Sequence, residues 1–492
     1  MQGTNREMLK ERLLQEFDKF YAGISDFALT EAGAHDIEQE VLSGLLGIGQ
    51  LAMSGLIAGK IESVEEGPLF APNGEQLRCK GVETRQYLSI FGPMVISRQS
   101  YWGQSVGKVH VADERLQLPK GSQWSYILQE LVGECAAEND FRESVNVVNK
   151  LLKLNLSGKS SERNAGSLGS LVGAYYESSP PKTEDGPVSF YASFDGKGVP
   201  KIKDRSAQTG ENPKKRLGKG EKPGPMQMAT VTATSGFAPK KRTKESILWS
   251  LMGRGSPAKG AEAGQKSGNG WHEGIHRRAF LGDQQKAVEY GIGDIRARMK
   301  NPDSRFMVAI DGGIGLEEKV LAVVLEMGLQ PQFEGIILDI IHVNEYVWDA
   351  ASALFGEKSK SRASWVEAVM GDLLDSKTDK VVKDLKAIAQ KTKLTENKLN
   401  QINKTITYFT NHKHKMDYKR FLEKGFPIST ALAESTCGFL VKKRMEQGGM
   451  RWSSNGAQNI LDLRAVKLNN DTTQFMKFVI KAQHPHAFKR AA

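Results

Sequence analysis

Two hydrophobic runs that each end in Asp-Gly constrain the fold of this chain more than any other feature. The run at 189–194 is followed by Asp195, and the run at 306–310 is followed by Asp311. Their composition predicts buried β-strands, so each aspartate stands where a strand ends. A single Asp-Gly after a strand is most often only a turn. Two of them, each closing a hydrophobic strand, favour a pair of carboxylates positioned by an α/β sheet.

A third acidic residue, Glu434, lies far downstream in a stretch typical of a helix, where Ser429 or Thr430 is suited to cap the first turn. A surface glutamate is the simplest interpretation. Carboxylates on two strand ends and a late helix are, however, the oxygen ligands that Mg²⁺ prefers. Two such ions stabilise both the attacking and the leaving oxygen of a phosphodiester. The pattern predicts a two-metal site formed by Asp195, Asp311 and Glu434.

A further apolar run, residues 336–341, is interrupted by one charged residue, Asp339. A carboxylate inside a buried strand must be paired, bound to a metal or protonated. His342 follows three residues later, where the next helix is expected to begin. A lone histidine in that place is usually a hydrogen-bonding partner within the fold.

The order of predicted elements defines the expected architecture. Helical periodicity covers residues 7–66, a β-hairpin with Gly92-Pro93 at its turn is predicted at 87–97, and helices return over 122–177. The remaining elements are strands at 188–194, 226–234 and 246–252, a helix at 271–299, a strand at 306–310, a helix at 316–327, a strand at 335–341 and a charged helical block at 358–421. This is the order of an α/β, RNase H-like domain interrupted by an all-helical insertion before its last acidic helix.

The chain of 492 residues is too long for a single core, so we expect several regions. They are an N-terminal helical region at 1–66, a small β-hairpin region at 67–121, a helix-turn-helix-like region at 122–182, the first part of the catalytic core at 183–345, the helical insertion at 346–425, the Glu-bearing end of the core at 426–465 and a C-terminal tail at 466–492.

Composition limits the compartment in which the protein is expected and the kind of partner that it binds. Lys plus Arg number 68 against 57 for Asp plus Glu, which gives a net charge of +11 and favours a polyanion such as DNA. The three cysteines form no Cys-x-x-Cys pair, so no Cys-rich zinc site is expected, and their scattered placement suits a reducing compartment. Residues 1–7 do not resemble a signal peptide. We therefore expect a cytoplasmic protein.

The stretch from Val41 to Gly59 carries no charged residue and could be mistaken for a membrane span. It contains five glycines as well as Ser43, Gln50 and Ser54. A span needs about 20 strongly apolar residues. We therefore expect a buried helix here and no membrane partner.

Residues 141–176 combine a helix, a short break and a second helix. The first helix is predicted at Phe141–Leu152, the break at 153–157 and the second helix at 160–176, which carries Arg163 on its polar face. This arrangement is compatible with a helix-turn-helix DNA reader. An ordinary helical hairpin explains it equally well, because no residue here is diagnostic by itself.

Basic clusters flank the predicted metal site in the sequence. Residues 197–222 contain nine basic and three acidic residues in a Gly/Pro-rich loop. A charge run is usually a solvated face, but these positions favour contact with phosphates. The candidate DNA contacts are Arg163, Lys214, Lys215, Arg216, Lys240, Lys241, Arg242, Lys442, Lys443 and Arg451.

Several motifs together resemble one family. They are Ser193–Gly198, Ala309–Gly312, Ile337–Tyr346 and the block from Gly425 to Ala465, which contains Glu434-Ser435, Gly449–Ser453 and Leu463–Ala465. These segments are similar to bacterial insertion-sequence transposases of the ISKra-type group within the Mutator-like DDE transposases. The resemblance covers most of 85–465, and the block at 425–465 is its most specific part.

The resemblance implies an RNase H-like fold with an Asp-Asp-Glu site and an all-helical insertion. Asp195 corresponds to the first aspartate, Asp311 to the second and Glu434 to the glutamate, while Asp339 and His342 match a Cys/Asp-x-x-His motif and are expected to shape the site. Two departures stand out. Residues 101–107 lack the Cys-x-x-Cys zinc element of many relatives, so no zinc is expected, and residues 430–431 replace the usual Ser-Gly before the glutamate.

The expected activity is DNA transposition with two Mg²⁺ ions per site, or Mn²⁺ as the substitute. One ion would activate water and later the freed 3′-hydroxyl, and the other would stabilise the leaving 3′-oxygen. Double-stranded DNA is the expected partner. The resemblance alone implies a bacterial, nucleoid-associated protein and a homodimer or larger assembly. Two alternatives stay open: a catalytically silent DNA-binding relative, and a structure-specific nuclease on the same fold.

Overall fold

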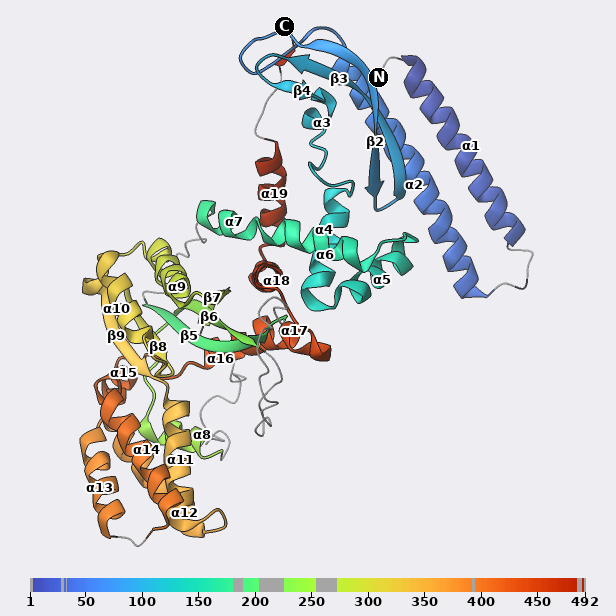
Figure 1. The fold of residues 1–492 in the computed structure, drawn as a ribbon. Coiled ribbons are helices and arrows are strands. Elements are labelled where there is room, and N and C mark those ends of the chain that lie inside the picture. Colours follow the sequence, from blue (N-terminus) through green and yellow to red (C-terminus); the bar gives the residue numbers. More distant parts are fainter. Residues whose placement is uncertain are drawn as a thin grey trace, which may run out of the picture. The chain divides into compact units, whose positions relative to one another are not determined.

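The computed structural model describes residues 3–27, 31, 33–179, 189–202, 225–253, 272–391, 394–484 and 489–490 (Figure 1). The chain divides into two compact units. The terminal unit comprises residues 1–175 and 470–492, and the central unit comprises residues 176–469.

The terminal unit begins with two long helices, α1 (Gly3–Phe27) and α2 (Ala34–Glu65). They pack closely because Gly44 of α2 leaves the space that the Phe20 ring of α1 occupies. The expectation that α2 is buried is wrong: its buried residues are Gly59 and Ile61. The reason is that the apolar residues surround the helix, whereas α1 and the neighbouring hairpin cover only part of it. Among the described residues, α2 alone is long and apolar enough to cross a membrane, by length and composition.

A three-stranded antiparallel sheet follows, formed by β2 (Arg78–Ser89), β3 (Gly92–Gly103) and β4 (Gly107–Val109). Ser89 pairs with Gly92, so the turn is Ile90-Phe91 and not the predicted Gly92-Pro93. Gly92 has a φ of +118°. Glycine is required there because other residues rarely adopt that conformation. A two-stranded sheet of β1 (Leu69–Phe70) and β10 (Lys489–Arg490) completes the strands of this unit.

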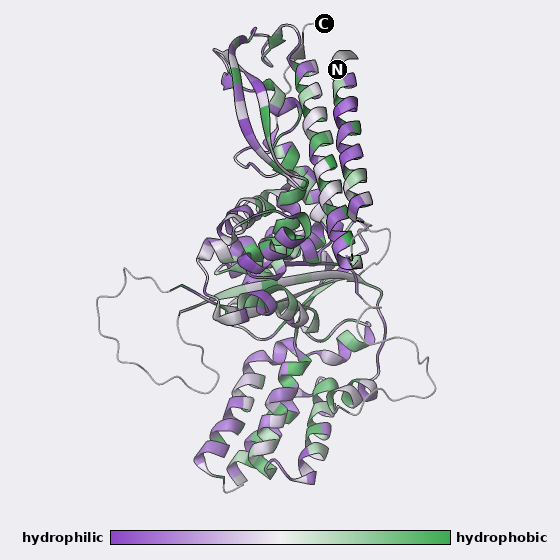
Figure 2. Cartoon of the chain, turned by 90° about the vertical axis from the view of Figure 1, so that its right-hand side faces the viewer, coloured by the Kyte–Doolittle hydropathy of each residue, from purple (hydrophilic) through white to green (hydrophobic). Residues whose placement is uncertain are grey.

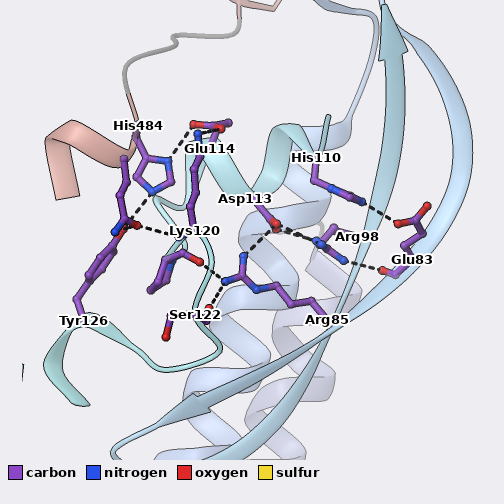
Figure 3. Close-up of polar contacts among 12 residues, drawn as sticks. Glu83, Arg85, Arg98, His110, Asp113, Glu114, Lys120, Ser122, Tyr126 and His484 are labelled. Atoms are coloured by element: carbon purple, nitrogen blue, oxygen red, sulfur yellow. Dashed lines mark hydrogen bonds and ion pairs between the residues drawn. The ribbon is translucent and has the colours of Figure 1, made fainter. Parts of the chain in front are cut away.

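A buried polar network joins this sheet to the short helix α3 (Val111–Arg115) (Figure 3). Asp113 accepts hydrogen bonds from Arg98 Nε at 2.7 Å and from Arg85 Nη1 at 3.1 Å. His484, near the other end of the chain, contacts Glu114 at 2.9 Å. The C-terminal segment is thereby held on the N-terminal sheet, which explains why both ends of the chain form one unit.

Four helices complete the fold around the predicted DNA reader: α4 (Tyr126–Glu138), α5 (Phe141–Leu152), α6 (Gly158–Gly169) and α7 (Val172–Ser178). The bounds of α5 are those predicted, because the Asp140 carboxylate caps its start and Lys153, in a left-handed conformation, ends it. The second predicted helix is two helices, α6 and α7. The last helix of the unit is α19 (Thr472–Gln483).

The central unit contains a mixed sheet in the order β7-β6-β5-β8-β9. Its strands are β5 (Ser189–Pro200), β6 (Met226–Phe237), β7 (His272–Leu281), β8 (Arg305–Ile310) and β9 (Phe333–Leu338). Strands β5, β6 and β7 are antiparallel, and β5, β8 and β9 are parallel. One face of the sheet packs on α9 (Gln284–Arg298) and α10 (Leu316–Glu326), and the other on α11 (Ile340–Phe355) and the helices that follow. The α/β class is confirmed.

The third strand is misplaced in the sequence prediction. Residues 246–252 lie in and just after helix α8 (Lys244–Leu251), whose start is capped by the Thr243 hydroxyl, and β7 falls inside the predicted helix at 271–299. The charged sequence of β7 is tolerated because a helix, α18 (Ser454–Leu468), covers the outer edge of this strand. Gln458 accepts from Leu281 N at 2.8 Å and donates to Ala279 O at 2.9 Å. Side-chain amides therefore take the place of a neighbouring strand.

The residues predicted as the helical insertion, 346–425, are mainly helical, and the first of these helices, α11, already begins at Ile340. Beyond α11 the insertion contains α12 (Lys360–Leu374), α13 (Thr378–Lys391), α14 (Glu396–His412) and α15 (Tyr418–Glu423). These helices carry both hydrophilic and hydrophobic residues (Figure 2). Their buried residues, among them Met370, Leu373 and Phe409, join the same core as the sheet residues Tyr191 and Met307. The insertion is thus continuous with the core that supports one face of the sheet.

Candidate active site

The two predicted aspartates lie at matching positions on adjacent parallel strands. Asp311 directly follows β8, but the prediction that Asp195 ends a strand is wrong, because β5 continues to Pro200 in its pairing with β6. Ser193 of β5 pairs with Ala309 of β8, and Asp195 and Asp311 each lie two residues further along. Carboxyl ends of neighbouring parallel strands meet at one edge of a sheet. The register therefore aligns the two candidate carboxylates, although they are 116 positions apart in the sequence.

Strand alternation also assigns a face to these residues. Phe190, Ala192 and Phe194 belong to the core beneath α9 and α10, whereas Tyr191 belongs to the opposite core, with α11 and the insertion. Asp195 shares the parity of Tyr191 along β5. Ala309 of β8 lies in that same opposite core. Asp311 is two residues further along, so it is on the same side of the sheet as Ala309. Both carboxylates are half-exposed and project from the face that carries the insertion.

Backbone amides hold each carboxylate locally. Asp195 Oδ1 accepts from Gly196 N at 2.7 Å, and Asp311 Oδ1 accepts from Gly313 N at 2.9 Å. The Asp311 carbonyl accepts from the Tyr408 hydroxyl at 3.0 Å, so α14 of the insertion contacts the strand end directly. Sequence reasoning missed Tyr408, because nothing in its local sequence relates it to Asp311.

Glu434 is exposed and lies on the short helix α16 (Ala431–Thr436). Three contacts attach the start of this helix to the sheet. Ile340 N donates to Ile428 O at 3.0 Å, the Tyr191 hydroxyl donates to Ser429 O, and the Thr430 hydroxyl donates to Asp339 Oδ2 at 2.8 Å. The main chain before Glu434 is therefore anchored to β5 and to the end of β9.

Cys437 lies close enough to both Asp195 and Glu434 for their charges to affect its thiol. Burial raises the pKa of the Cys437 thiol, and so do the charge of Asp195, its hydrogen bond with Asp195 and the charge of Glu434. The thiol stays protonated at neutral pH, so it is not a nucleophile. Its contacts indicate that α16 faces the end of β5. Sequence reasoning missed this residue too, since a single cysteine outside a metal motif carries little signal.

The segment after Glu434 has an unusual helix. Residues Cys437–Lys442 form a π-helix, followed by α17 (Lys443–Met445). The buried Arg464 of α18 donates from Nε to Leu440 O at 2.8 Å and also donates to Phe439 O. Single π-helical turns often occur at functional sites, and their carbonyls need such donors. Arg464 lies in the family-like block, but its sequence context did not predict this contact.

Asp339 and His342 form the predicted pair behind the site. Asp339 is completely buried, and its carboxylate accepts from His342 Nδ1 at 2.7 Å as well as from Thr430. The hydrogen bond to Asp339 raises the pKa of His342 to about 9, against the opposing effect of burial, and the charges of Asp339, Glu345 and Asp311 add to the rise. His342 is therefore a cation at neutral pH, and its side chain is 38% exposed.

The carboxylates suit a hard cation only in part. Donor chemistry and strand register fit, because half-exposed Asp195 and Asp311 present oxygen ligands from one face of the sheet. Within the described ranges, however, no group of three or more His, Cys, Asp or Glu side chains lies close enough together to hold a metal ion. Glu434 thus does not complete a preassembled three-ligand site with the two aspartates.

The predicted DNA contacts divide into three sets. Lys214, Lys215 and Arg216 lie outside the described residues. The exposed ones are Arg163 in the terminal unit and Lys240, Lys241, Lys442, Lys443 and Arg451 in the central unit. Arg242 differs from the prediction: its guanidinium donates to Phe426 O at 2.7 Å, and burial lowers its pKa to about 10. It packs the 239–242 segment onto the turn before α16 because Gly425 permits that close approach.

Comparisons with known proteins add little. No protein-family model matches the sequence, and no curated protein matches it. Among solved structures, the chain is similar to the transposase in the Drosophila P element transposase strand transfer complex. The identity is 9%, the match covers 74% of this chain and 97% of that chain, and the TM-score is 0.24. Such a low score carries no argument about fold or activity, so the function is argued from the site.

Proposed function

We propose that the central unit is an RNase H-like nuclease domain and that the chain is a DNA transposase of the Asp-Asp-Glu type. The observation that carries the proposal is the register of β5 and β8, which aligns Asp195 and Asp311 at one sheet edge. The sheet supports it, since three antiparallel strands followed by two parallel strands in the order β7-β6-β5-β8-β9 is the arrangement expected for that fold. The insertion before Glu434 lies where the proposal requires it.

In the proposed reaction, Asp195 and Asp311 would hold divalent cations, and Glu434 would complete the set once the side chains converge. Bound ions of this kind activate the attacking oxygen and stabilise the leaving oxygen of a phosphodiester. The chain itself supplies position and charge. Asp339 and Thr430 fix the start of α16, and the His342 cation offers a positive charge to the phosphate.

DNA would be gripped by exposed basic side chains of the central unit. Lys442 and Lys443 follow Glu434 by eight and nine residues, and Arg451 precedes the backbone pairing of Trp452 with the end of β5. Phosphate contacts of this kind position a duplex without reading its sequence. Exposed Arg163 on α6 is the corresponding candidate in the helix-turn-helix-like region of the terminal unit.

The test is Mg²⁺-dependent cleavage of DNA that carries the inverted repeats flanking the reading frame, followed by a strand-transfer assay. Asp195→Asn, Asp311→Asn and Glu434→Gln should each abolish cleavage. Asp303→Asn is the matched control, because Asp303 is an exposed aspartate at the opposite end of β8. Normal cleavage by the three site variants would refute the assignment, and cleavage of branched DNA without strand transfer would favour a structure-specific nuclease.

A second candidate is a DNA-binding protein without catalysis. The absence of a three-ligand group among the described side chains favours it. It predicts DNA binding that weakens steeply with salt and gives no Mg²⁺-dependent product. Any nicking by the wild-type chain that Asp195→Asn removes would exclude this candidate.

A further inference from the structure

The loop after Asp311 presents an apolar side chain entirely to solvent. Ile314 is 99% exposed, more than any other large hydrophobic residue described. The neighbouring helix α10 also carries exposed leucines, but Leu321 is 47% and Leu325 65% exposed. We propose that Ile314 is a wedge that enters a base step of bound DNA beside the cleavage site. This inference rests on the proposed function and adds a residue that deforms the substrate.

The loop that carries Ile314 is short and held at its base. Gly312 and Gly315 have φ values of +87° and +74°, which turn the chain sharply on either side of the isoleucine. Gly312 lies against α14, since a Cβ there would meet the Tyr408 hydroxyl at 3.1 Å and His412 Nε2 at 3.3 Å. The Tyr408 hydroxyl also donates to the Asp311 carbonyl at 3.0 Å. The base of the loop therefore cannot collapse onto the helix to bury its apex.

The tip of the loop is hydrogen-bonded to the Asp311 carboxylate. Asp311 Oδ1 accepts from Gly313 N at 2.9 Å, so the residue before Ile314 bonds directly to that side chain. A substrate held at Asp311 would meet Ile314 three residues further along. The β-branched side chain has few rotamers, so little conformational entropy is lost when it inserts into a confined space.

The acidic residues near the loop do not prevent DNA from approaching Ile314. Glu317, in the first turn of α10, is paired with Lys415 and with His414 at 2.7 Å, and both contacts lower its pKa against the opposing effect of burial. Glu318 is exposed. An apolar wedge contacts bases and not phosphates, so one exposed carboxylate beside it is compatible with insertion from a groove. Proteins that kink duplexes use Ile, Leu, Met or Phe in this way and lower the cost at flexible or unpaired steps.

Binding measurements with the full chain test the proposal without requiring cleavage. The probes are two duplexes of about 30 base pairs in EDTA, one fully paired and one with a mismatched central TA step that removes most of the unstacking cost. Each carries 2-aminopurine at that step. Wild-type protein should bind the mismatched duplex about tenfold more tightly, and the fluorescence of the paired duplex should rise on binding.

Ile314→Ala should bind the two duplexes within about twofold of each other and lose the fluorescence rise. Leu325→Ala is the matched control, because it removes an exposed apolar side chain from the same segment, and it should behave like wild type. Ile314→Val, which keeps a β-branched side chain, should retain most of the preference. An unchanged preference in Ile314→Ala, or no preference in wild type that binds both duplexes, would overturn the wedge.

The outcomes separate this inference from the function on which it rests. Wild-type protein that prefers the mismatched duplex but cleaves no DNA with Mg²⁺ would retain the wedge and lose the catalytic assignment. Cleavage by wild type with equal activity in Ile314→Ala, and equal binding of the two duplexes, would retain the catalytic assignment and reject the wedge. Failure to bind either duplex would reject both.

Discussion

The central unit holds aspartates in two contrasting environments, on opposite faces of one sheet. Asp294 of α9 is buried and accepts hydrogen bonds from Thr234 at 2.5 Å and His276 at 2.8 Å, with Arg298 at 3.4 Å. Asp195 and Asp311 are half-exposed, and backbone amides supply their hydrogen bonds together with the Cys437 thiol at Asp195. A structural carboxylate has its lone pairs occupied by the fold, whereas a site carboxylate keeps oxygen atoms accessible to a ligand.

Removal of Asp294 should have the largest effect on stability. Asp294→Ala removes the carboxylate that pairs with the buried Arg298 and the part-buried His276, which costs about 3–5 kcal/mol. Urea unfolding should show this loss, and Glu289→Ala, which removes an exposed acid from the same helix, should cost under about 0.5 kcal/mol. A loss below about 1 kcal/mol for Asp294→Ala would show that the two environments do not differ as described.

Asp195→Asn should show the reverse pattern. The side chain is half-exposed, so the free energy of unfolding should change by under about 1 kcal/mol. Loss of a metal-binding carboxylate should nevertheless lower DNA cleavage by roughly a thousandfold, equivalent to about 4 kcal/mol. Unfolding and cleavage should be measured on the same preparation of the variant. If Asp195→Asn loses both stability and cleavage, Asp195 is a structural carboxylate like Asp294.

Thr430→Val should give an intermediate effect, because Asp339 belongs to both environments: it is buried and it supports the site. The substitution leaves the Asp339 carboxylate without one donor, at a cost of about 1–3 kcal/mol. Thr436→Val in the same helix removes only a hydroxyl bond to the Leu432 carbonyl and should cost less. Cleavage should fall more than DNA binding in Thr430→Val, since the start of α16 shifts relative to the sheet.

His342 should give the smallest effect and the clearest pH dependence. Its pKa rises from 6.5 to about 9 in the folded chain, so its pairing with Asp339 stabilises the fold fully below about pH 6.5 and is lost as the pH rises through 9. Because the side chain is more than a third exposed, we expect under about 1 kcal/mol. The difference in unfolding free energy between wild type and His342→Asn should shrink between about pH 6 and pH 10, and a constant difference would contradict the assignment.

Local pattern predicted some elements well and others poorly. Both ends of the helix Phe141–Leu152 are predicted correctly, because a capping aspartate marks its start and its apolar residues lie on one face. The strand predicted at 246–252 is wrong, because these residues lie in or just after α8, which begins with a Thr cap. The helix predicted at 271–299 is right for α9 but wrong for residues 272–281, which form β7 and are stabilised by a side-chain amide of the distant helix α18. The apolar helix α2 was expected to be buried, but burial depends on the area that neighbours cover.

The sequence likewise predicts some residues of the candidate site and misses others. Two aspartates after hydrophobic runs and a late glutamate are visible in the sequence, whereas the partners that hold them are not. Tyr408 and Cys437 contact the site from separate helices, and their local sequences carry no sign of it. Thr430 was predicted as a helix cap, but its hydroxyl donates to Asp339 and makes no capping hydrogen bond. Arg242 shows the opposite error, since a basic cluster near the site predicted a DNA contact and the guanidinium instead supports the turn before α16.

The sequence by itself determined which residues can carry the chemistry: acids that follow hydrophobic runs, a third acid on a late helix and an excess of basic side chains. These follow from local hydrophobicity and charge, which act over a few residues. Only the tertiary structure decided that Asp195 and Asp311 share one register, that α16 is anchored beside them and that Ile314 stays uncovered. Such relations depend on pairing and packing between distant segments, which no local pattern specifies.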